Sequence, residues 1–225
     1  MAQQLFFNNS TEIHRMSRYL CILDFEANCA ETKEEMSRLH MDNEVIEFPS
    51  VLVEVLSDGT TKKISEFQVY VKPRNTPILT NFCTELTKIT QDKVDAGVTF
   101  PVALKMHEDW LKANIPDYYK MVGDDKVLII TCGRWDLSVM APKEYVNWNI
   151  KPSKIYARFV NIKDDFEKFY HTKSHSMMNQ LNFLQLTHEG THHSGIDDCK
   201  NISNIAIRMI NDGLAFENFH VSKIK

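Results

Sequence analysis

The most constraining feature of the sequence is an apolar run, Tyr19-Leu20-Cys21-Ile22-Leu23, that continues directly into Asp24-Phe25-Glu26. An uninterrupted apolar run of this length is typical of a strand that is buried on both faces, as in the middle of an α/β sheet. Side chains two apart on a strand share a face, so Asp24 and Glu26 are predicted to point the same way. Two such carboxylates repel each other and lose hydration, and a bound cation relieves both costs. The alternative is that the strand has ended and both acids are hydrated loop residues.

Length and composition set the broad class of the protein. The 225 residues, 43% of them hydrophobic and 25% charged, can bury a substantial core. We find no apolar run long enough to span a membrane and no secretory signal near the start of the sequence. Five scattered cysteines without a Cys-x-x-Cys pair disfavour a disulfide framework and a structural zinc site, and they predict an intracellular compartment, cytoplasmic or nuclear. The net charge of −4 argues against binding nucleic acid through overall charge, although a local basic groove or metal ions in an acidic site could still bind it.

The order of predicted elements indicates a single α/β domain at 18–225, preceded by a short leader at 1–17 that we expect to be frayed or disordered. Three β-rich stretches joined by short links, at 19–23, 45–55 and 64–71, predict an antiparallel meander. The other predicted elements are a strand at 127–130 and helices that begin after Thr99, run from Met177 to near Gly190, and run from about Asp197 to Asn211.

The last of these helices carries an acid in an unusual position. Counting back one helical turn from Ile202 on the apolar face reaches Asp198, which is therefore predicted to face the core in the first turn. The structural alternative is that Asp198 only complements the helix dipole, with Asp197 as the N-cap. His193 lies five residues before Asp198 and can be either a base or a bystander in a loop.

A third acid, Asp136, follows the predicted strand at 127–130 after a Gly-Arg-Trp turn. Loops at strand ends are where α/β folds place ligands, although Asp136 alone could be a helix N-cap. Together with Asp24, Glu26 and Asp198 it offers oxygen ligands, which suit Mg²⁺ or Mn²⁺ better than zinc. Four carboxylates are enough for two ions about 3.5–4 Å apart, an arrangement that stabilises the attacking and leaving oxygens of phosphoryl displacement. A histidine suits proton removal from the attacking water at neutral pH.

The same residues match, in order, the three exonuclease motifs of the DEDDh superfamily of 3′→5′ exonucleases. The matching segments are Asp24-Phe25-Glu26-Ala27, Trp135-Asp136 and His193-Ser194-Gly195-Ile196-Asp197-Asp198. The sequence most resembles the enhanced-RNAi and histone-mRNA 3′-exonuclease branch, over roughly residues 17–215. Subsidiary matches include Val45-Ile46-Glu47-Phe48-Pro49, Tyr70-Val71-Lys72-Pro73 and Leu86-Thr87-Lys88-Ile89-Thr90-Gln91. The resemblance implies a ribonuclease-H-like (DnaQ-like exonuclease) α/β fold, in which a mixed sheet with an antiparallel meander is flanked by helices.

The resemblance also implies the metal ligands and the ions. Asp24 would bridge two Mg²⁺ ions, which Mn²⁺ could replace. Glu26 and Asp198 would complete one metal site and Asp136 the other. The spacing of the family motif selects Asp198 over its neighbour Asp197.

The remaining implied roles concern proton transfer and substrate binding. His193 would be the general base, since the family spacing of four residues before the aspartate selects it over His192. The backbone near Ala27 and the ring of Trp135 would hold the 3′-terminal nucleotide, together with His193. Cys132 and Thr191 stand where relatives often carry a polar or acidic residue and an arginine, respectively. We expect no SAP module, the family's nucleic-acid-binding module, because a leader of 17 residues is too short to hold it.

We therefore expect a metal-dependent 3′→5′ exonuclease that degrades single-stranded RNA or 3′ overhangs to nucleoside 5′-monophosphates. Two alternatives are an inactive nucleic-acid-binding adaptor with the same fold and an exonuclease whose natural substrate is DNA. The basic and aromatic stretch at 151–175 could follow a phosphate backbone, or it could be a hydrated helix face with its aromatic rings in the core. No membrane contact is expected, and the sequence does not indicate a protein partner.

Overall fold

The computed structural model describes residues 17–224, so the predicted leader lies, apart from Ser17, outside the described residues. Within this range seven strands form one sheet. The strands are β1 (Arg18–Leu23), β2 (Glu26–Ala27), β3 (Val45–Val55), β4 (Thr61–Tyr70), β5 (Val127–Thr131), β6 (Arg158–Asn161) and β7 (Val221–Lys223). The helices are α2 (Lys33–Arg38), α3 (Asn81–Thr87), α4 (Gln91–Asp95), α5 (Phe100–Asn114), α6 (Tyr118–Gly123), α7 (Ala141–Trp148), α8 (Ile162–Tyr170), α9 (Met177–Leu184) and α10 (Gly195–Asn211). Three short helical turns are η1 (Asp136–Met140), η2 (Lys154–Ala157) and η3 (Phe216–Asn218).

The sheet combines antiparallel and parallel pairs. Strands β1, β3 and β4 form the predicted antiparallel meander, and β2 extends the line of β1 along β3. On its other side β1 runs parallel to β5, and β5 runs parallel to β6. The predicted mixed sheet with an antiparallel meander is thus confirmed. Strands β6 and β7 were not predicted, because four and three residues are too few for a period to emerge.

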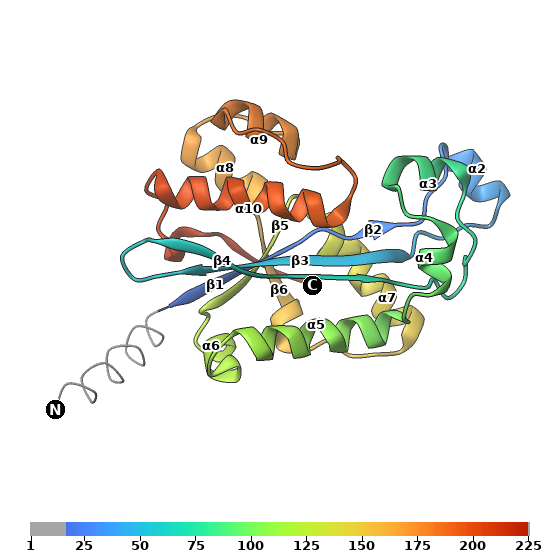
Figure 1. Ribbon diagram of the computed structural model, residues 1–225, viewed down its shortest axis with the longest axis horizontal. Coiled ribbons are helices and arrows are strands. Elements are labelled where there is room, and N and C mark those ends of the chain that lie inside the picture. Colours follow the sequence, from blue (N-terminus) through green and yellow to red (C-terminus); the bar gives the residue numbers. More distant parts are fainter. Residues whose placement is uncertain (1–16, 225) are drawn as a thin grey trace.

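Helices cover both faces of the sheet. Figure 1 shows α8, α9 and α10 on one face and α5, α6 and α7 on the other, with α2, α3 and α4 gathered at one end. Alternate residues of β1 serve the two layers: Leu20 and Ile22 pack in the cluster that includes α9 and α10, and Cys21 packs in the cluster that includes α5 and α7. The prediction of a central strand buried on both faces is therefore confirmed.

Two predicted helix boundaries are wrong. Helix α9 ends at Leu184 rather than near Gly190, because Gln185 adopts a left-handed conformation (φ 55°) that terminates it. Helix α10 begins earlier than predicted, with Ser194 as its N-cap. Asp197 therefore lies inside the first turn and is not the cap. Thr99 does precede α5, as predicted.

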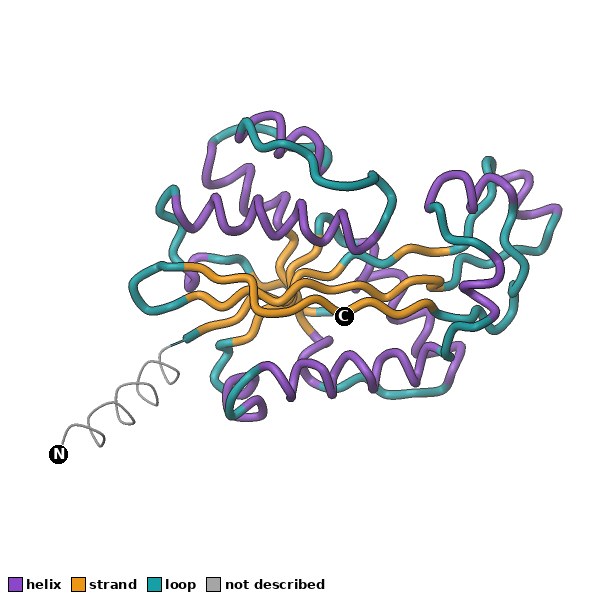
Figure 2. The backbone as a smooth tube through the Cα atoms, viewed as in Figure 1, coloured by secondary structure: helices purple, strands orange, loops and turns teal. Residues whose placement is uncertain are grey.

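The basic and aromatic stretch at 151–175 folds as η2, β6 and α8 (Figure 2). Tyr156, Phe159 and Phe166 are almost completely buried in the two core layers. These three rings cannot stack on bases, and this observation favours the structural interpretation of the stretch. No helix in the described part of the chain is long and apolar enough to cross a membrane.

Candidate metal-binding active site

The four predicted acids reach one place from three separate parts of the chain. Asp24 follows β1, Glu26 begins β2, Asp136 begins η1 just after β5, and Asp198 lies in the first turn of α10. Because β1 and β5 are parallel, their carboxyl ends meet at the same edge of the sheet. A cavity of about 250 Å³ lies there, and its lining includes Asp24, Glu26 and Asp198.

Asp136 is held directly beside this cavity. One of its carboxylate oxygens accepts a hydrogen bond from the backbone N–H of Phe25, at 2.9 Å. Phe25 lies between Asp24 and Glu26 in the chain, so this bond ties η1 to the segment that carries both acids. The structure thus brings all four predicted acids together.

Burial and mutual repulsion perturb the acids strongly. Burial is the main cause that raises the pKa of Asp24 well above its usual value, and Asp136, Glu26 and Asp198 add repulsion. Burial, with repulsion from Glu47 and Asp198, raises the pKa of Glu26 to about 9. The pKa of Asp136 rises only to about 6, because the Phe25 N–H and the positive charge of Lys163 offset burial. Carboxylates in such an environment are favourable sites for a divalent cation, which stabilises their ionised forms.

Asp198 also organises the loop before α10. Its Oδ2 accepts the backbone N–H of His193 at 3.0 Å, and its Oδ1 lies 3.3 Å from Nδ1 of His192. His193 has a left-handed backbone (φ 66°). One of its ring nitrogens and one carboxylate oxygen each from Glu26 and Asp198 all lie within 4.8 Å of one another.

The protonation of His193 suits a base. Burial is the main cause that lowers its pKa, and the neighbouring His192 lowers it further. A neutral imidazole at pH 7 has a nitrogen free to accept a proton. The two rings stack with centroids 4.0 Å apart, and both line the cavity. The selection of His193 over His192 therefore stays a prediction.

Trp135 and Ala27, the two other predicted substrate contacts, are not among the residues that line the cavity. Trp135 is 41% exposed, at the surface beside Asp136. Ala27 is buried, and its carbonyl lies 3.7 Å from Sγ of Cys83, within reach of a weak S–H hydrogen bond. A nucleotide-binding role for Trp135 and Ala27 stays a prediction.

Sequence reasoning assigned no role to Glu47, a fifth acid at this site. Glu47 is 1% exposed and lies opposite Glu26 in the β2–β3 pair. Its carboxylate accepts hydrogen bonds from the Gly195 N–H (3.2 Å) and from Gln68 (2.6 Å). Glu47 therefore anchors the first residue of α10, the helix that presents Asp198. The available signal was an acid between the apolar residues Ile46 and Phe48 of β3.

Lys163 was also missed as part of the site. It lies in the first turn of α8 and lines the cavity together with Cys132 and Met177. In the sequence it is one of many lysines in the stretch 151–175, and only the parallel pairing of β5 with β6 brings it here.

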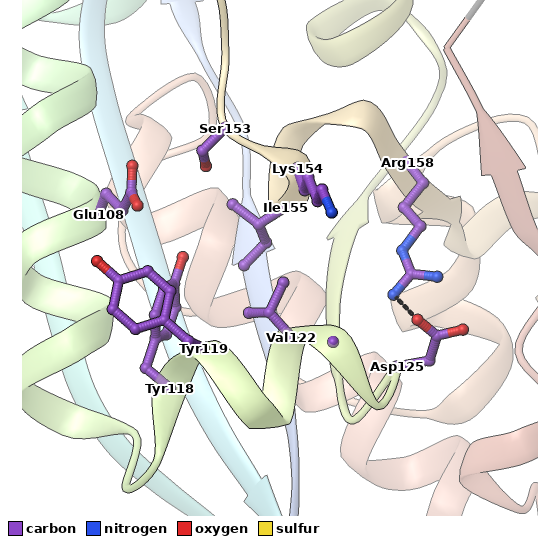
Figure 3. Close-up of a pocket in the computed structure, with 10 residues that line it drawn as sticks. Glu108, Tyr118, Tyr119, Val122, Asp125, Ser153, Lys154, Ile155 and Arg158 are labelled. Carbon is purple, nitrogen blue, oxygen red and sulfur yellow. Dashed lines mark ion pairs between the residues drawn. The ribbon is translucent and has the colours of Figure 1, made fainter.

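A larger cavity of about 620 Å³ lies at the other end of the sheet (Figure 3). It is bordered by Tyr119 of α6 and by the ion pair between Asp125 and Arg158. Asp125 precedes β5 and Arg158 begins β6, whereas the acid cluster follows the strands' carboxyl ends. This cavity is therefore separate from the acid cluster.

Comparisons with known proteins agree with this geometry. The family model described as Exonuclease (RNase T) matches residues 21–206. The chain is 36% identical over 214 residues to 3′-5′ exoribonuclease 1 of Homo sapiens, covering 94% of this chain but only 58% of that relative's length. It is 30% identical over 205 residues to the 3′-5′ exonuclease Snipper of Drosophila melanogaster, covering 88% of this chain and 71% of that protein.

A solved structure extends the similarity to the fold. The nuclease domain of 3′hExo, a DEDDh family member crystallised with rAMP, superimposes with a TM-score of 0.78 at 32% identity. The match covers 92% of this chain and 98% of that domain. Such a likeness confirms the predicted ribonuclease-H-like fold, and this fold implies dependence on divalent metal ions. The carboxylates described above fit that requirement.

Proposed function

Because this chain belongs to the RNase T family of exonucleases, we propose that it is a metal-dependent 3′→5′ exonuclease that hydrolyses single-stranded RNA or 3′ overhangs to nucleoside 5′-monophosphates. The observation that carries the proposal is the convergence of Asp24, Glu26 and Asp198 at one cavity that His193 also lines, with Asp136 bound to the Phe25 N–H beside it. RNA is the favoured substrate because the relatives include proteins named exoribonuclease. We assign the activity to a single domain at 18–225.

The acids divide between two ion sites in this proposal. Asp24 would contribute to both, Glu26 and Asp198 would hold one ion, and Asp136 would hold the other. Mg²⁺ is the expected ion, with Mn²⁺ able to replace it, because every ligand is a hard carboxylate oxygen. When bound, the ions would stabilise the charge on the attacking and leaving oxygens of the scissile phosphate.

His193 is the proposed general base. Its neutral ring stands within reach of Glu26 and Asp198, where the attacking water would be deprotonated. The hydrogen bond from its own backbone N–H to Asp198 fixes the loop that carries the ring. Lys163, at the rim of the same cavity, offers a positive charge to the phosphate backbone.

The 3′-terminal nucleotide would be positioned by Trp135 and by the backbone near Ala27. The exposed ring of Trp135 can stack on a base, since base–aromatic stacking contributes about 1–3 kcal/mol per base. His193 would contact the same terminal nucleotide.

Two other functions would use the same site. An inactive adaptor would bind RNA without shortening it, and a deoxyribonuclease would prefer DNA. The complete set of acids favours an enzyme over an adaptor.

The test is a time course with 5′-labelled single- and double-stranded RNA and DNA, in Mg²⁺ and in EDTA. We expect stepwise shortening of single-stranded RNA in Mg²⁺ only. Asp24→Asn and Asp136→Ala should abolish it, and His193→Ala should slow it by roughly 10²–10⁴. Asp124→Asn, which changes an exposed acid at the far end of the sheet, is the matched control. Shortening that survives in Asp24→Asn would remove the acid cluster from the mechanism, and RNA binding without shortening would indicate the adaptor.

A further inference from the structure

Two histidines that the proposed mechanism does not use, His188 and His192, lie close to Oδ1 of Asp198. Oδ2 of Asp198 is occupied by the His193 N–H, while Oδ1 lies 3.3 Å from His192 Nδ1 and 4.0 Å from His188 Nε2. His188 comes from the segment after α9, His192 from the loop before α10, and Asp198 from α10 itself. One ring nitrogen from each histidine and a carboxylate oxygen of Asp198 all lie within 4.8 Å of one another.

The His188 ring carries an unsatisfied polar atom. Its Nε2 is buried and has no hydrogen-bond partner among the described residues. Burying a polar nitrogen without a partner costs about 1–3 kcal/mol, so such atoms call for an explanation. This nitrogen faces Asp198 Oδ1 across a gap that is too long for a hydrogen bond.

The donor set and its spacing suit a transition metal. Two imidazole nitrogens and one carboxylate oxygen form a ligand set used by zinc when it keeps an open fourth position. Bonds of about 2.0–2.2 Å in tetrahedral geometry place ligand atoms roughly 3.3 Å apart. The His192–Asp198 distance already has this value. His188 Nε2 lies less than about 1 Å too far from Asp198 Oδ1, and the two histidine ligand atoms lie within 4.8 Å of each other. His192 is half exposed, which gives an ion access from solvent.

We propose that His188, His192 and Asp198 form a Zn²⁺ site that overlaps the proposed Mg²⁺ site by sharing Asp198, and that Zn²⁺ bound there inhibits turnover. The regulatory part of this inference rests on the proposed function, whereas the binding part does not. Mg²⁺ does not compete for the imidazoles, because it prefers oxygen ligands and octahedral geometry. Zn²⁺ at this site withdraws Asp198 from the hard-ion site and fixes His192, whose ring stacks on the proposed base His193.

The binding experiment uses the full chain carrying Asp24→Asn, which disables the shared hard-ion site. Zn²⁺ affinity is measured by competition with a chromogenic chelator, and Co²⁺ serves as a spectroscopic substitute. We expect one bound ion whose affinity falls by more than about tenfold on adding His188→Gln or His192→Gln, since even the loss of a second-shell partner costs 10–100-fold. His171→Gln, at an exposed histidine at the end of α8, is the matched control and should change nothing.

Unchanged affinity in both His188→Gln and His192→Gln, with circular dichroism showing intact folding, would overturn the site. Zinc bound equally well by these variants would instead reside on other groups, such as the neighbouring thiols of Cys29 and Cys83. In that case the 3.3 Å contact between His192 and Asp198 is only an ordinary polar contact.

The inhibition experiment measures RNA shortening in Mg²⁺ with increasing Zn²⁺. His188→Gln should keep the basal rate and shift the inhibitory Zn²⁺ concentration upward by more than about tenfold. Equal sensitivity in wild type and His188→Gln would refute the regulatory role. Absence of shortening in Mg²⁺ alone would refute the proposed function, while the chelator competition would still decide the binding site.

Discussion

Replacing Glu26 with glutamine should stabilise the metal-free protein while it weakens metal binding at one of the two proposed ion sites. Burial and repulsion from Glu47 raise the pKa of Glu26 from its usual 4.5 to about 9. Between these two values the folded protein holds a proton that the unfolded chain has released. The stability that this bound proton contributes is therefore fully present below pH 4.5 and is lost progressively as the pH rises towards 9.

The magnitude follows from this difference in proton binding. Each pH unit within the interval lowers the free energy of unfolding by about 1.4 kcal/mol, which amounts to about 3 kcal/mol at pH 7. Glutamine resembles the protonated acid and avoids the penalty. For a chain of this length 1 kcal/mol corresponds to about 2–4 °C, so the Tm of Glu26→Gln should exceed that of wild type by roughly 6–12 °C at pH 7 in EDTA.

The assay is thermal unfolding followed by circular dichroism at pH 5 and pH 7, in EDTA and in Mg²⁺. At pH 5 the advantage of the variant should shrink to below about 1 kcal/mol. Mg²⁺ should raise the Tm of wild type, because it binds only the folded state, and should raise the Tm of the variant less, because one of the two proposed ion sites has lost a ligand. Glu85→Gln changes an exposed acid and should stay within about 0.5 kcal/mol of wild type. A variant that is no more stable than wild type at pH 7 in EDTA would refute the claim that these acids are held together against repulsion.

Two further predictions concern packing and a buried histidine. A Cβ at Gly195 would lie 2.8 Å from Pro49 Cγ and 3.0 Å from the Asp24 carbonyl oxygen, so Gly195→Ala should cost about 1–3 kcal/mol and reduce RNA shortening. Gly123→Ala in α6 meets open space and should be neutral or stabilising by up to about 1 kcal/mol; equal effects in the two variants would contradict the close approach of α10 to β1 and β3. Burial lowers the pKa of His107 to about 3, so wild type should lose about 2 kcal/mol of stability relative to His107→Gln as the pH falls from 7 to 5. A difference that stays constant over this range in urea titrations would show that His107 does not titrate in the predicted way.

The sequence alone predicted the central strand and the acids that follow it. The uninterrupted apolar run at 19–23 predicts a strand that is buried on both faces. The two-residue period of a strand then places Asp24 and Glu26 on the same side. The helical period likewise put Asp198 on the buried face of α10. The ends of helices were predicted less accurately, such as the end of α9 at Leu184. A left-handed glutamine terminates that helix, and nothing in the local pattern distinguishes it.

Only the tertiary structure decided which other groups stand beside the acids. The β2–β3 register places Glu47 opposite Glu26, and the parallel pairing of β5 with β6 brings Lys163 to the cavity. The segment between α9 and α10 brings both His188 and His192 close to Asp198. The hydrophobic period of a helix or strand predicts which of its own faces is buried. Contacts between residues far apart in the chain depend on strand register and loop conformation, which the whole packed core fixes together.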